Sequence, residues 1–302
     1  MERVYYYTSM AVFQSLLHNI QIIEGKPHFM FWASNIFYMN DSQEFYYGHE
    51  MLMRVLGKLE REWNVEERLC VSKIWDDYTS KNKKEWGHIL LKEIHNQGES
   101  PYVISFSKKE DYLPMWVHYA DRGKGVCMAF ADYRNTPIVK DKMENDHFEK
   151  IDDLQTSTVC YEDFEESESP METIRNMYVD YLDKIYLEKD KEKIFQKKLG
   201  LLAGLTIVCA PCLKTNHYKY ESEKRIIKLI SDNDLTKIKF RTNLNGNIVP
   251  YIEVPIPFSQ LDYVIIGPCA NYELTESAIE LMITRYNLKF EIRKTSVKYR
   301  IY

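Results

Sequence analysis

The chain has 302 residues, 45% of them hydrophobic and 14% aromatic, which is enough to bury a core in one large domain or two smaller ones. A net charge of −5 at pH 7 excludes recruitment of nucleic acid by the field of the whole protein, although a local basic patch would still attract it. The first residues lack the layout of a signal peptide, and no run approaches the roughly 20 apolar residues that span a bilayer. We therefore expect a cytoplasmic protein that has no membrane segment and keeps its six cysteines reduced.

The N-terminal third of the chain is predicted to combine short strands with long helices. Apolar patterns of strand type predict strands at 4–7, 28–32 and 35–39. Ser9 is expected to cap a short helix, because apolar residues follow it at helical spacing. Asp41 begins a long helix to about residue 64, and further helical segments are predicted near 65–78 and 83–96.

The middle of the chain changes character several times. A buried-type strand is predicted at 102–107, a short helix or turn at 113–120 and another strand at 125–130. Residues 132–156 are polar and expected to be rich in loops, and the acidic stretch 163–169 is expected to be a solvated loop. Pro170 suits the first turn of a helix that runs to about residue 196, with residues 201–208 as its buried continuation.

The C-terminal third is predicted to be rich in strands, with one amphipathic helix over 274–287 capped by Thr275. The predicted strands are 225–231, 236–241, 248–254, 262–267, 290–295 and 297–301. Strands therefore cluster at both ends of the sequence, with helices inserted between them. This arrangement predicts a single α+β domain over residues 1–302, with helical insertions near 41–96 and 170–208.

Three polar clusters stand at the ends of predicted strands. The first, Tyr5 to Ser9, ends the first strand, and helix capping explains Ser9 alone. The second is Ser105 and Ser107, which share one face of a strand and could hydrogen-bond a ligand or simply end the strand in a turn. The third is the stretch from Glu221 to Arg225, which could equally be a charged edge strand.

Glu221 and Glu223 are the most informative pair in the sequence. They precede the apolar run 226–230, and carboxylates two residues apart on extended backbone point the same way. Such a pair can stabilise positive charge and orient a hydroxyl together. By contrast, Cys209 and Cys212 follow an apolar run instead of opening a βαβ unit, so we expect two buried thiols and no metal or redox site there.

Five motifs in order resemble an uncharacterised bacterial family of unknown function over nearly the whole chain. That family's signature is Tyr-His-Tyr-Thr-Ser, Asn-Asp-x-x-Glu, Ser-Phe-Ser, Trp-x-x-Tyr followed by Gly-x-Gly-Val, and Glu-x-Glu-x-Arg. The corresponding residues here are Tyr5–Ser9, Asn40–Glu44, Ser105–Ser107, Trp116–Tyr119 with Gly123–Val126, and Glu221–Arg225. The order of a first-strand Thr/Ser, a Ser-x-Ser strand and a Glu-x-Glu strand is in turn similar to ADP-ribosyltransferases.

This resemblance implies an ADP-ribosyltransferase-like split β-sheet core with a helical insertion, and NAD as the substrate. It implies that Glu223 accepts a hydrogen bond from the ribose 2′-hydroxyl and that Glu221 orients or deprotonates the acceptor, an unknown protein or nucleic acid. It further assigns NAD binding to the remaining motif residues, with an aromatic face stacked on nicotinamide and Arg225 paired with a carboxylate or facing a phosphate. Those residues are Tyr6, Tyr7, Thr8, Ser105, Ser107, Trp116, Tyr119 and Arg225.

One departure from the family pattern leaves a second function open. Tyr6 stands where the family carries His or Arg, and a phenol brings no positive charge. The sequence therefore predicts either an enzyme that transfers ADP-ribose or hydrolyses NAD, implied by the resemblance to serve in bacterial toxin or phage-defence systems, or a non-catalytic module that binds a nucleotide or a partner. A metal-dependent nuclease fits less well, because the spacing of Glu221 and Lys224 misses that template by one residue.

Overall fold

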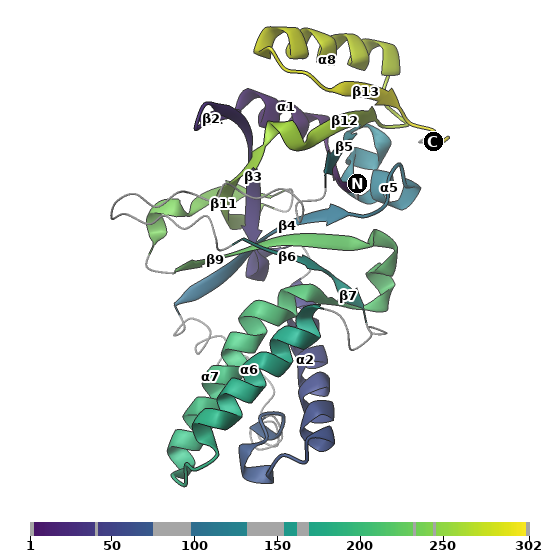
Figure 1. The fold of residues 1–302 in the computed structure, drawn as a ribbon. Coiled ribbons are helices and arrows are strands. Elements are labelled where there is room, and N and C mark those ends of the chain that lie inside the picture. Colours follow the sequence, from purple (N-terminus) through teal and green to yellow (C-terminus); the bar gives the residue numbers. More distant parts are fainter. Residues whose placement is uncertain are drawn as a thin grey trace.

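The protein is a mixed α+β structure built on one large sheet (Figure 1). The computed structural model describes residues 3–39, 42–74, 98–131, 154–161, 169–231, 234–243 and 246–299. The strands of the sheet are β1 (Arg3–Thr8), β2 (Gln21–Ile23), β3 (Lys26–Asn35), β4 (Glu99–Ser107), β5 (Val126–Ala131), β6 (Leu154–Thr158), β9 (Glu223–Ser231), β10 (Lys239–Thr242), β11 (Ile248–Pro257), β12 (Leu261–Ile266) and β13 (Glu291–Lys294). The predicted α+β class is confirmed.

The sheet branches at β4, and this branching shapes the molecule. One edge of β4 pairs along its whole length with β9, which also pairs with β6. The other edge pairs near its start with β3, through Tyr102 and Val103, and at its end with β1, through Ser107. Two arms therefore leave the same edge: β3 continues to β11 and β10, whereas β1 continues to β5, β12 and β13.

Alternation along β4 separates the two faces of the sheet. Tyr102, Ile104 and Phe106 point into one apolar core, which α1 (Met10–His18) and α8 (Tyr272–Tyr286) cover. On the opposite face, Val103 packs into the core of a helical lobe, whereas β1 and β5 pack against α5 (Leu113–Tyr119). Ser105 and Ser107 share this second face and lie between the lobe and α5.

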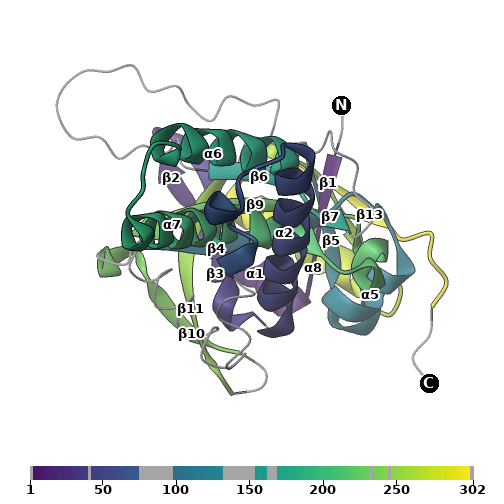
Figure 2. The same ribbon diagram turned by 90° about the horizontal axis from the view of Figure 1, so that it is seen from below.

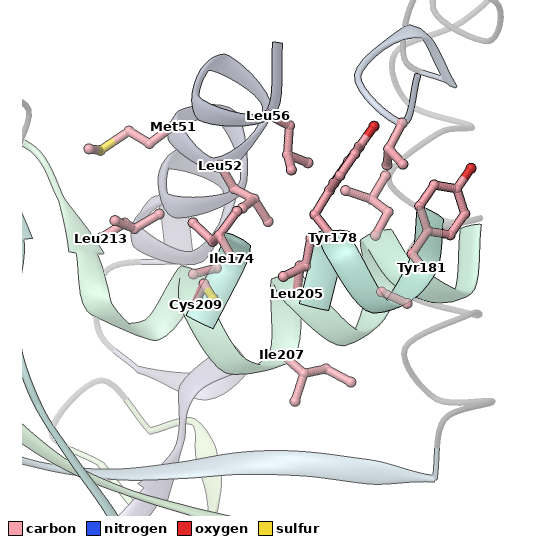
Figure 3. Close-up of a cluster of buried hydrophobic side chains, with 14 of the residues drawn as sticks. Met51, Leu52, Leu56, Ile174, Tyr178, Tyr181, Leu205, Ile207, Cys209 and Leu213 are labelled. Atoms are coloured by element: carbon pink, nitrogen blue, oxygen red, sulfur yellow. The ribbon is translucent and has the colours of Figure 1, made fainter. Parts of the chain in front are cut away.

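The helical lobe comprises α2 (Ser42–Glu62), α6 (Ser169–Ile185) and α7 (Lys191–Cys209), which lie in front of β4 and β9 in the view of Figure 2. Their apolar side chains interdigitate in a continuous core, shown in Figure 3. Glu60 is buried within it and accepts hydrogen bonds from the Val71 amide and the Tyr178 hydroxyl, at 2.5 and 2.7 Å. This carboxylate therefore ties the segment after α2 to α6.

The stretch Lys191–Cys212, which contains α7, is long and apolar enough to cross a membrane by length and composition alone. No such segment was predicted from the sequence. However, α7 buries Leu199, Leu202, Leu205 and Ile207 in the core of the lobe, as a core helix of a soluble protein does.

Two glycines allow backbone segments to approach one another where β1, β5 and β12 meet. A Cβ on Gly125 would lie 2.0 Å from the Thr8 carbonyl oxygen, and one on Gly267 would lie 2.4 Å from the Gly123 carbonyl oxygen. The Gly267 amide donates to the Gly125 carbonyl at 2.9 Å. Gly125, the second glycine of the Gly-x-Gly-Val motif, thus serves close packing of the backbone.

Short connecting segments complete the part between the lobe and β9. A two-stranded sheet pairs β7 (Cys160–Tyr161) with β8 (Leu213–Lys214) in parallel. The 3-10 segments are η1 (Ile36–Tyr38), η2 (Glu67–Leu69), η3 (Asp121–Gly123), η6 (Ala210–Cys212), η7 (Asn216–Glu221), η8 (Leu235–Lys237) and η9 (Phe258–Gln260).

Most predicted elements are confirmed, and the errors are local. The strand predicted at 35–39 is wrong, because Asn35 ends β3 and its side chain caps η1 by accepting from the Phe37 amide. The described part of the helix predicted at 65–78 contains η2, a short turn and helical residues at 73–74, whereas the helix predicted at 83–96 lies outside the described residues. So do Asn40, Asp41 and most of the loops predicted at 132–156 and 163–169; the described side chains of α2 begin at Tyr47.

Further differences occur in the second half of the chain. The helix predicted from 170 to 196 is two helices, α6 and α7, and residues 201–208 continue α7 as expected. Four short strands, β2, β6, β7 and β8, were not predicted, and residues 295–299 do not form the strand predicted over 297–301. Helix α8 is capped by Asn271, whose side chain accepts from the Leu274 amide, so the prediction of Thr275 as the cap is wrong.

The close packing at Gly125 predicts opposite effects for two identical substitutions. Gly125→Ala should destabilise the protein by about 1–3 kcal/mol or more, because the new methyl group overlaps the Thr8 carbonyl. Gly204→Ala in α7 should be neutral or stabilising by up to about 1 kcal/mol, because its Cβ meets only Met177 at 3.4 Å and alanine favours a helix. Thermal unfolding of both variants would measure this, and similar melting temperatures would contradict it.

Candidate active site

Residues from all three predicted clusters surround one cavity of about 200 Å³ on the second face of the sheet. It lies at the ends of β1, β4 and β9, between α5 and the segment that leaves the helical lobe. This is where neither apolar layer covers the sheet. The lining residues are Tyr5, Tyr7, Met39, Ser105, Phe106, Ser107, Met115, Tyr119, Lys214, Tyr218, Glu221, Glu223 and Arg225.

Glu223 is buried and holds two cations. Arg225 donates from Nε and Nη2 to the two carboxylate oxygens of Glu223, at 2.9 and 3.0 Å. Lys214 Nζ lies 3.2 Å from Oε2 of the same carboxylate. Burial alone would raise the pKa of Glu223, but the charges of Arg225 and Lys214 outweigh burial and lower this pKa to about 2. Glu223 is therefore ionised at neutral pH.

Glu221 is held by Lys214 and by a phenol. Lys214 Nζ lies 2.7 Å from Glu221 Oε2, and the Tyr119 hydroxyl donates to Oε1 of the same carboxylate. Burial, reinforced by the Glu221 charge, raises the pKa of Tyr119, so its hydroxyl keeps its proton. Lys214 also lies 4.6 Å from the centre of the Tyr218 ring. Lys214 is thus the group that the two carboxylates share.

The carboxylates converge for a different reason from the one that the sequence suggested. The backbone between them is not extended: Glu221 ends η7, Ser222 adopts a left-handed conformation with φ 47° and ψ 55°, and Glu223 begins β9. The carbonyl of Ser222 accepts the Lys108 amide at 2.8 Å, which fixes this turn against the end of β4. The turn at Ser222, rather than strand geometry, brings Glu221 and Glu223 to Lys214.

The two serines of β4 have different roles. The Ser107 hydroxyl donates to the Glu221 carbonyl at 2.6 Å and accepts the Lys109 amide at 3.0 Å, so it fixes the loop that carries the acidic pair. The Ser105 hydroxyl faces Glu223 closely enough to help lower its pKa, but it makes no hydrogen bond of good geometry within the described residues. Ser105 therefore offers a hydroxyl to a ligand in the cavity.

Three residues of the predicted NAD site lie away from the cavity. Tyr6 is on the opposite face of β1, where its ring packs 4.9 Å from that of Phe31 in the core between the two arms of the sheet. Thr8 shares the face of Tyr6, because successive residues of a strand alternate. Trp116 is fully buried and donates from Nε1 to Asp111 at 2.8 Å. Its ring packs edge to face against the Tyr7 ring, with 5.1 Å between the ring centres.

Other lining residues were not predicted. Lys214 follows the Cys-x-x-Cys pair by two residues, and the sequence contains no signal that connects it with the carboxylates. Cys209 and Cys212 are buried free thiols, as expected, and the Pro211 carbonyl between them accepts Nη1 of Arg225 at 2.7 Å. Among the described residues, no three His, Cys, Asp or Glu side chains gather as a metal site would require.

A comparison with protein families matches residues 115–226 to the model described as "Protein of unknown function (DUF2971)". The matched region runs from α5 into β9 and covers less than half of the chain. It includes the cavity residues Tyr119, Lys214, Glu221, Glu223 and Arg225, but not those of β1 and β4. No curated protein and no solved structure matches the chain. The similarity therefore marks the charged half of the cavity without assigning an activity to it.

The lowered pKa of Glu223 predicts an acid-dependent loss of stability. The folded-state pKa of about 2 lies below the ordinary value of 4.5, so the unfolded state binds more protons between these pH values. The contribution of Glu223 to the free energy of unfolding is present above about pH 4.5 and is lost as pH falls towards 2. It amounts to roughly 3 kcal/mol at 1.4 kcal/mol per pKa unit. Chemical denaturation of wild type and Glu223→Gln at several pH values would measure it.

The variant should be less stable at neutral pH by about 3–5 kcal/mol, because Arg225 would stay buried without its carboxylate. The difference in the free energy of unfolding between the wild type and Glu223→Gln should narrow as pH falls from 4.5 to 2. Glu280→Gln on the exposed surface of α8 is the matched control and should follow the wild type. Parallel curves for wild type and Glu223→Gln would contradict the assignment.

Proposed function

We propose that the cavity binds NAD and cleaves its nicotinamide–ribose bond, transferring ADP-ribose to a macromolecule or to water. The observation that carries this proposal is the convergence of the ends of β1, β4 and β9, which brings Tyr7, Ser105 and the two carboxylates to one cavity. These are the segments whose order in the sequence is similar to ADP-ribosyltransferases. By the same resemblance, the protein would act in the bacterial cytoplasm, in a toxin or phage-defence system.

The chemistry requires negative charge beside a sugar carbon. When the C1′–N bond breaks, its electron pair moves to the nicotinamide nitrogen, neutral nicotinamide leaves, and positive charge develops on the ribose. A carboxylate fixed beside that carbon stabilises the charge more in the transition state than in the ground state. Glu223 suits this role because its low pKa keeps it ionised and Arg225 fixes both of its oxygens.

Glu221 is placed to act on the attacking group. Water or an acceptor hydroxyl forms the new bond to C1′ and gives up its proton, and a carboxylate within reach can take that proton. Tyr119 and Lys214 hold Glu221 from two sides, which sets its orientation. The Tyr5, Tyr7 and Tyr119 rings supply aromatic surface for a nicotinamide ring, and the Ser105 hydroxyl is available to its carboxamide.

The cavity volume sets the mode of binding under this proposal. About 200 Å³ accommodates the nicotinamide end of the dinucleotide but not the whole molecule, since pockets for ligands of drug size are roughly 300–1,000 Å³. The adenylate part would then lie outside the cavity. Tyr6 is not needed for this binding, because it faces the core on the other side of β1.

A second function, binding without catalysis, is favoured because both carboxylates are already paired with cations. Lys214 and Arg225 balance the charges of Glu221 and Glu223, so the described cluster carries no net negative charge towards a ligand. A non-catalytic module that binds a nucleotide or a partner would show this property. Such a module would bind without turnover, which gives the two functions different experimental outcomes.

The proposal predicts that purified protein, supplied with cell lysate as a source of acceptors, consumes NAD. Glu223→Gln should lower the rate of NAD loss by at least about 100-fold, the scale of losing one preorganised electrostatic contact. Nicotinamide release measured by chromatography is the readout, and the Glu280→Gln variant should retain the wild-type rate.

Thermal shift with NAD separates the alternatives. Stabilisation by NAD without any release of nicotinamide would support the binding module instead of the enzyme. If NAD neither stabilises the wild-type protein nor is consumed by it, both readings of the cavity as an NAD site are wrong. Circular dichroism should show that Glu223→Gln remains folded under the assay conditions.

A further inference from the structure

A second, larger depression lies on the other side of α5. It is an open groove of about 1,280 Å³, bounded by the end of α5, the loop after β12 and the C-terminal segment after β13. Val117 and His118 of α5 line this groove, whereas Tyr119 lines the smaller cavity. The helix therefore separates two depressions whose linings share no residue.

The position of the groove follows from the strand order. β12, α8 and β13 form a βαβ unit in which the two strands are parallel, with Ile266 beside Lys294 at their carboxyl ends. Ligands of α/β structures bind in the crevice outside the carboxyl ends of parallel strands, because the connecting loops diverge there. Gly267, Pro268 and residues 294–299 line the groove at that edge.

The rim of the groove is held in place by Asp111. Its carboxylate accepts hydrogen bonds from the Ser296 amide and hydroxyl, both at 2.7 Å, and from the Thr295 hydroxyl. The same carboxylate accepts Trp116 Nε1 at 2.8 Å, so it joins the C-terminal segment to α5. The two walls of the groove are thus connected through a part-buried carboxylate, and the groove is a preformed feature of the fold.

None of the acidic side chains that the structure describes lines the groove, whereas three basic side chains from separate segments do. These are Arg122 from η3, Lys294 from β13 and Lys298 from the C-terminal segment. Lys294 lies 3.8 Å from Glu273 and 4.7 Å from the centre of the Tyr272 ring. Arg122 and Lys298 are exposed and make no ion pair within the part of the chain that the structure describes.

Aromatic groups lie among these cations. His118, Tyr272 and Tyr299 line the same groove, and Thr295 and Ser296 add hydroxyls at its rim. Cations that track a phosphate backbone, combined with ring faces on which bases stack, are the usual means of binding a single strand of nucleic acid. A duplex is less suited to a concave lining than a single strand is, and one mononucleotide would fill only part of the volume.

We propose that this groove binds a single-stranded segment of nucleic acid, with Arg122, Lys294 and Lys298 contacting phosphates. The net charge of −5 provides no general attraction, so the affinity depends on these local cations. This proposal is independent of NAD cleavage, because it involves no residue of the smaller cavity.

The test is fluorescence anisotropy with labelled oligothymidylate and oligouridylate of about 12 nucleotides, titrated at several salt concentrations. The test variant is Arg122→Asn/Lys298→Gln; asparagine is chosen because Arg122 has a positive φ of 55°. Each lost phosphate contact should reduce the slope of log affinity against log salt by about 0.7 for a single strand. The double variant should therefore lose about 1.4 from the slope and at least about tenfold in affinity at low salt.

The matched control is Lys189→Gln/Lys191→Gln, which removes two exposed charges at the turn between α6 and α7. In Figure 1 this turn lies at the opposite end of the molecule from α8 and β13. The control should bind as the wild type does, and Lys298→Gln alone should lose about half of the effect on the slope. Melting temperatures of all variants should match, because the four side chains are exposed.

Several outcomes would overturn the proposal. They are no binding by the wild type at low salt, equal losses in the control and test variants, tighter binding of a duplex of the same length, or full competition by AMP at the concentration of the oligonucleotide. Competition by AMP would identify a mononucleotide site in place of a site for a strand. Because nicotinamide release involves the other cavity, a failure here leaves the NAD experiment unaffected.

Discussion

The central interaction of this structure is the buried group of two carboxylates and two cations at the start of β9. Glu221, Glu223, Lys214 and Arg225 come from η7, β9 and β8, and each charge has a partner of opposite sign. A buried charge without a partner would be costly, so the position of each of these side chains constrains the others. This mutual pairing connects η6, β8, η7 and β9, because Arg225 also donates to the Pro211 carbonyl of η6.

The surrounding fold explains why polar groups can gather there. The second face of the sheet has two apolar coverings, the helical lobe on β4 and β9 and α5 on β1 and β5. The cavity lies between them, at the point where the sheet branches and Ser107, the last residue of β4, pairs with Tyr5 in the middle of β1. Branching therefore creates a gap in the covering layer, and the charged group forms one wall of that gap.

Helix α5 has a further structural consequence, because it borders both depressions. Tyr119 holds Glu221 on one side, and His118 lines the basic groove on the other. The His118 ring also lies 6.0 Å from that of Tyr220, the residue before Glu221. The fold thus places a cavity lined by a charge-balanced group of carboxylates and cations on one side of a short helix, and an open cationic groove on the other. The linings of the two depressions share no residue.

Local sequence patterns by themselves determined the α+β class, most strands and helices, and the common face of Ser105 and Ser107. These properties depend on periodicity and on capping, which act over a few residues. The resemblance also grouped the first strand, the Ser-x-Ser strand and the acidic pair, and these three segments line one cavity in the structure. Only the tertiary structure decided that Tyr6 and Thr8 face the core, that Lys214 joins the two carboxylates, and that Ser222 turns the backbone between them. Those outcomes depend on strand order, on the branching of the sheet and on pairing of buried charges, which involve segments distant in the chain and leave no short-range pattern.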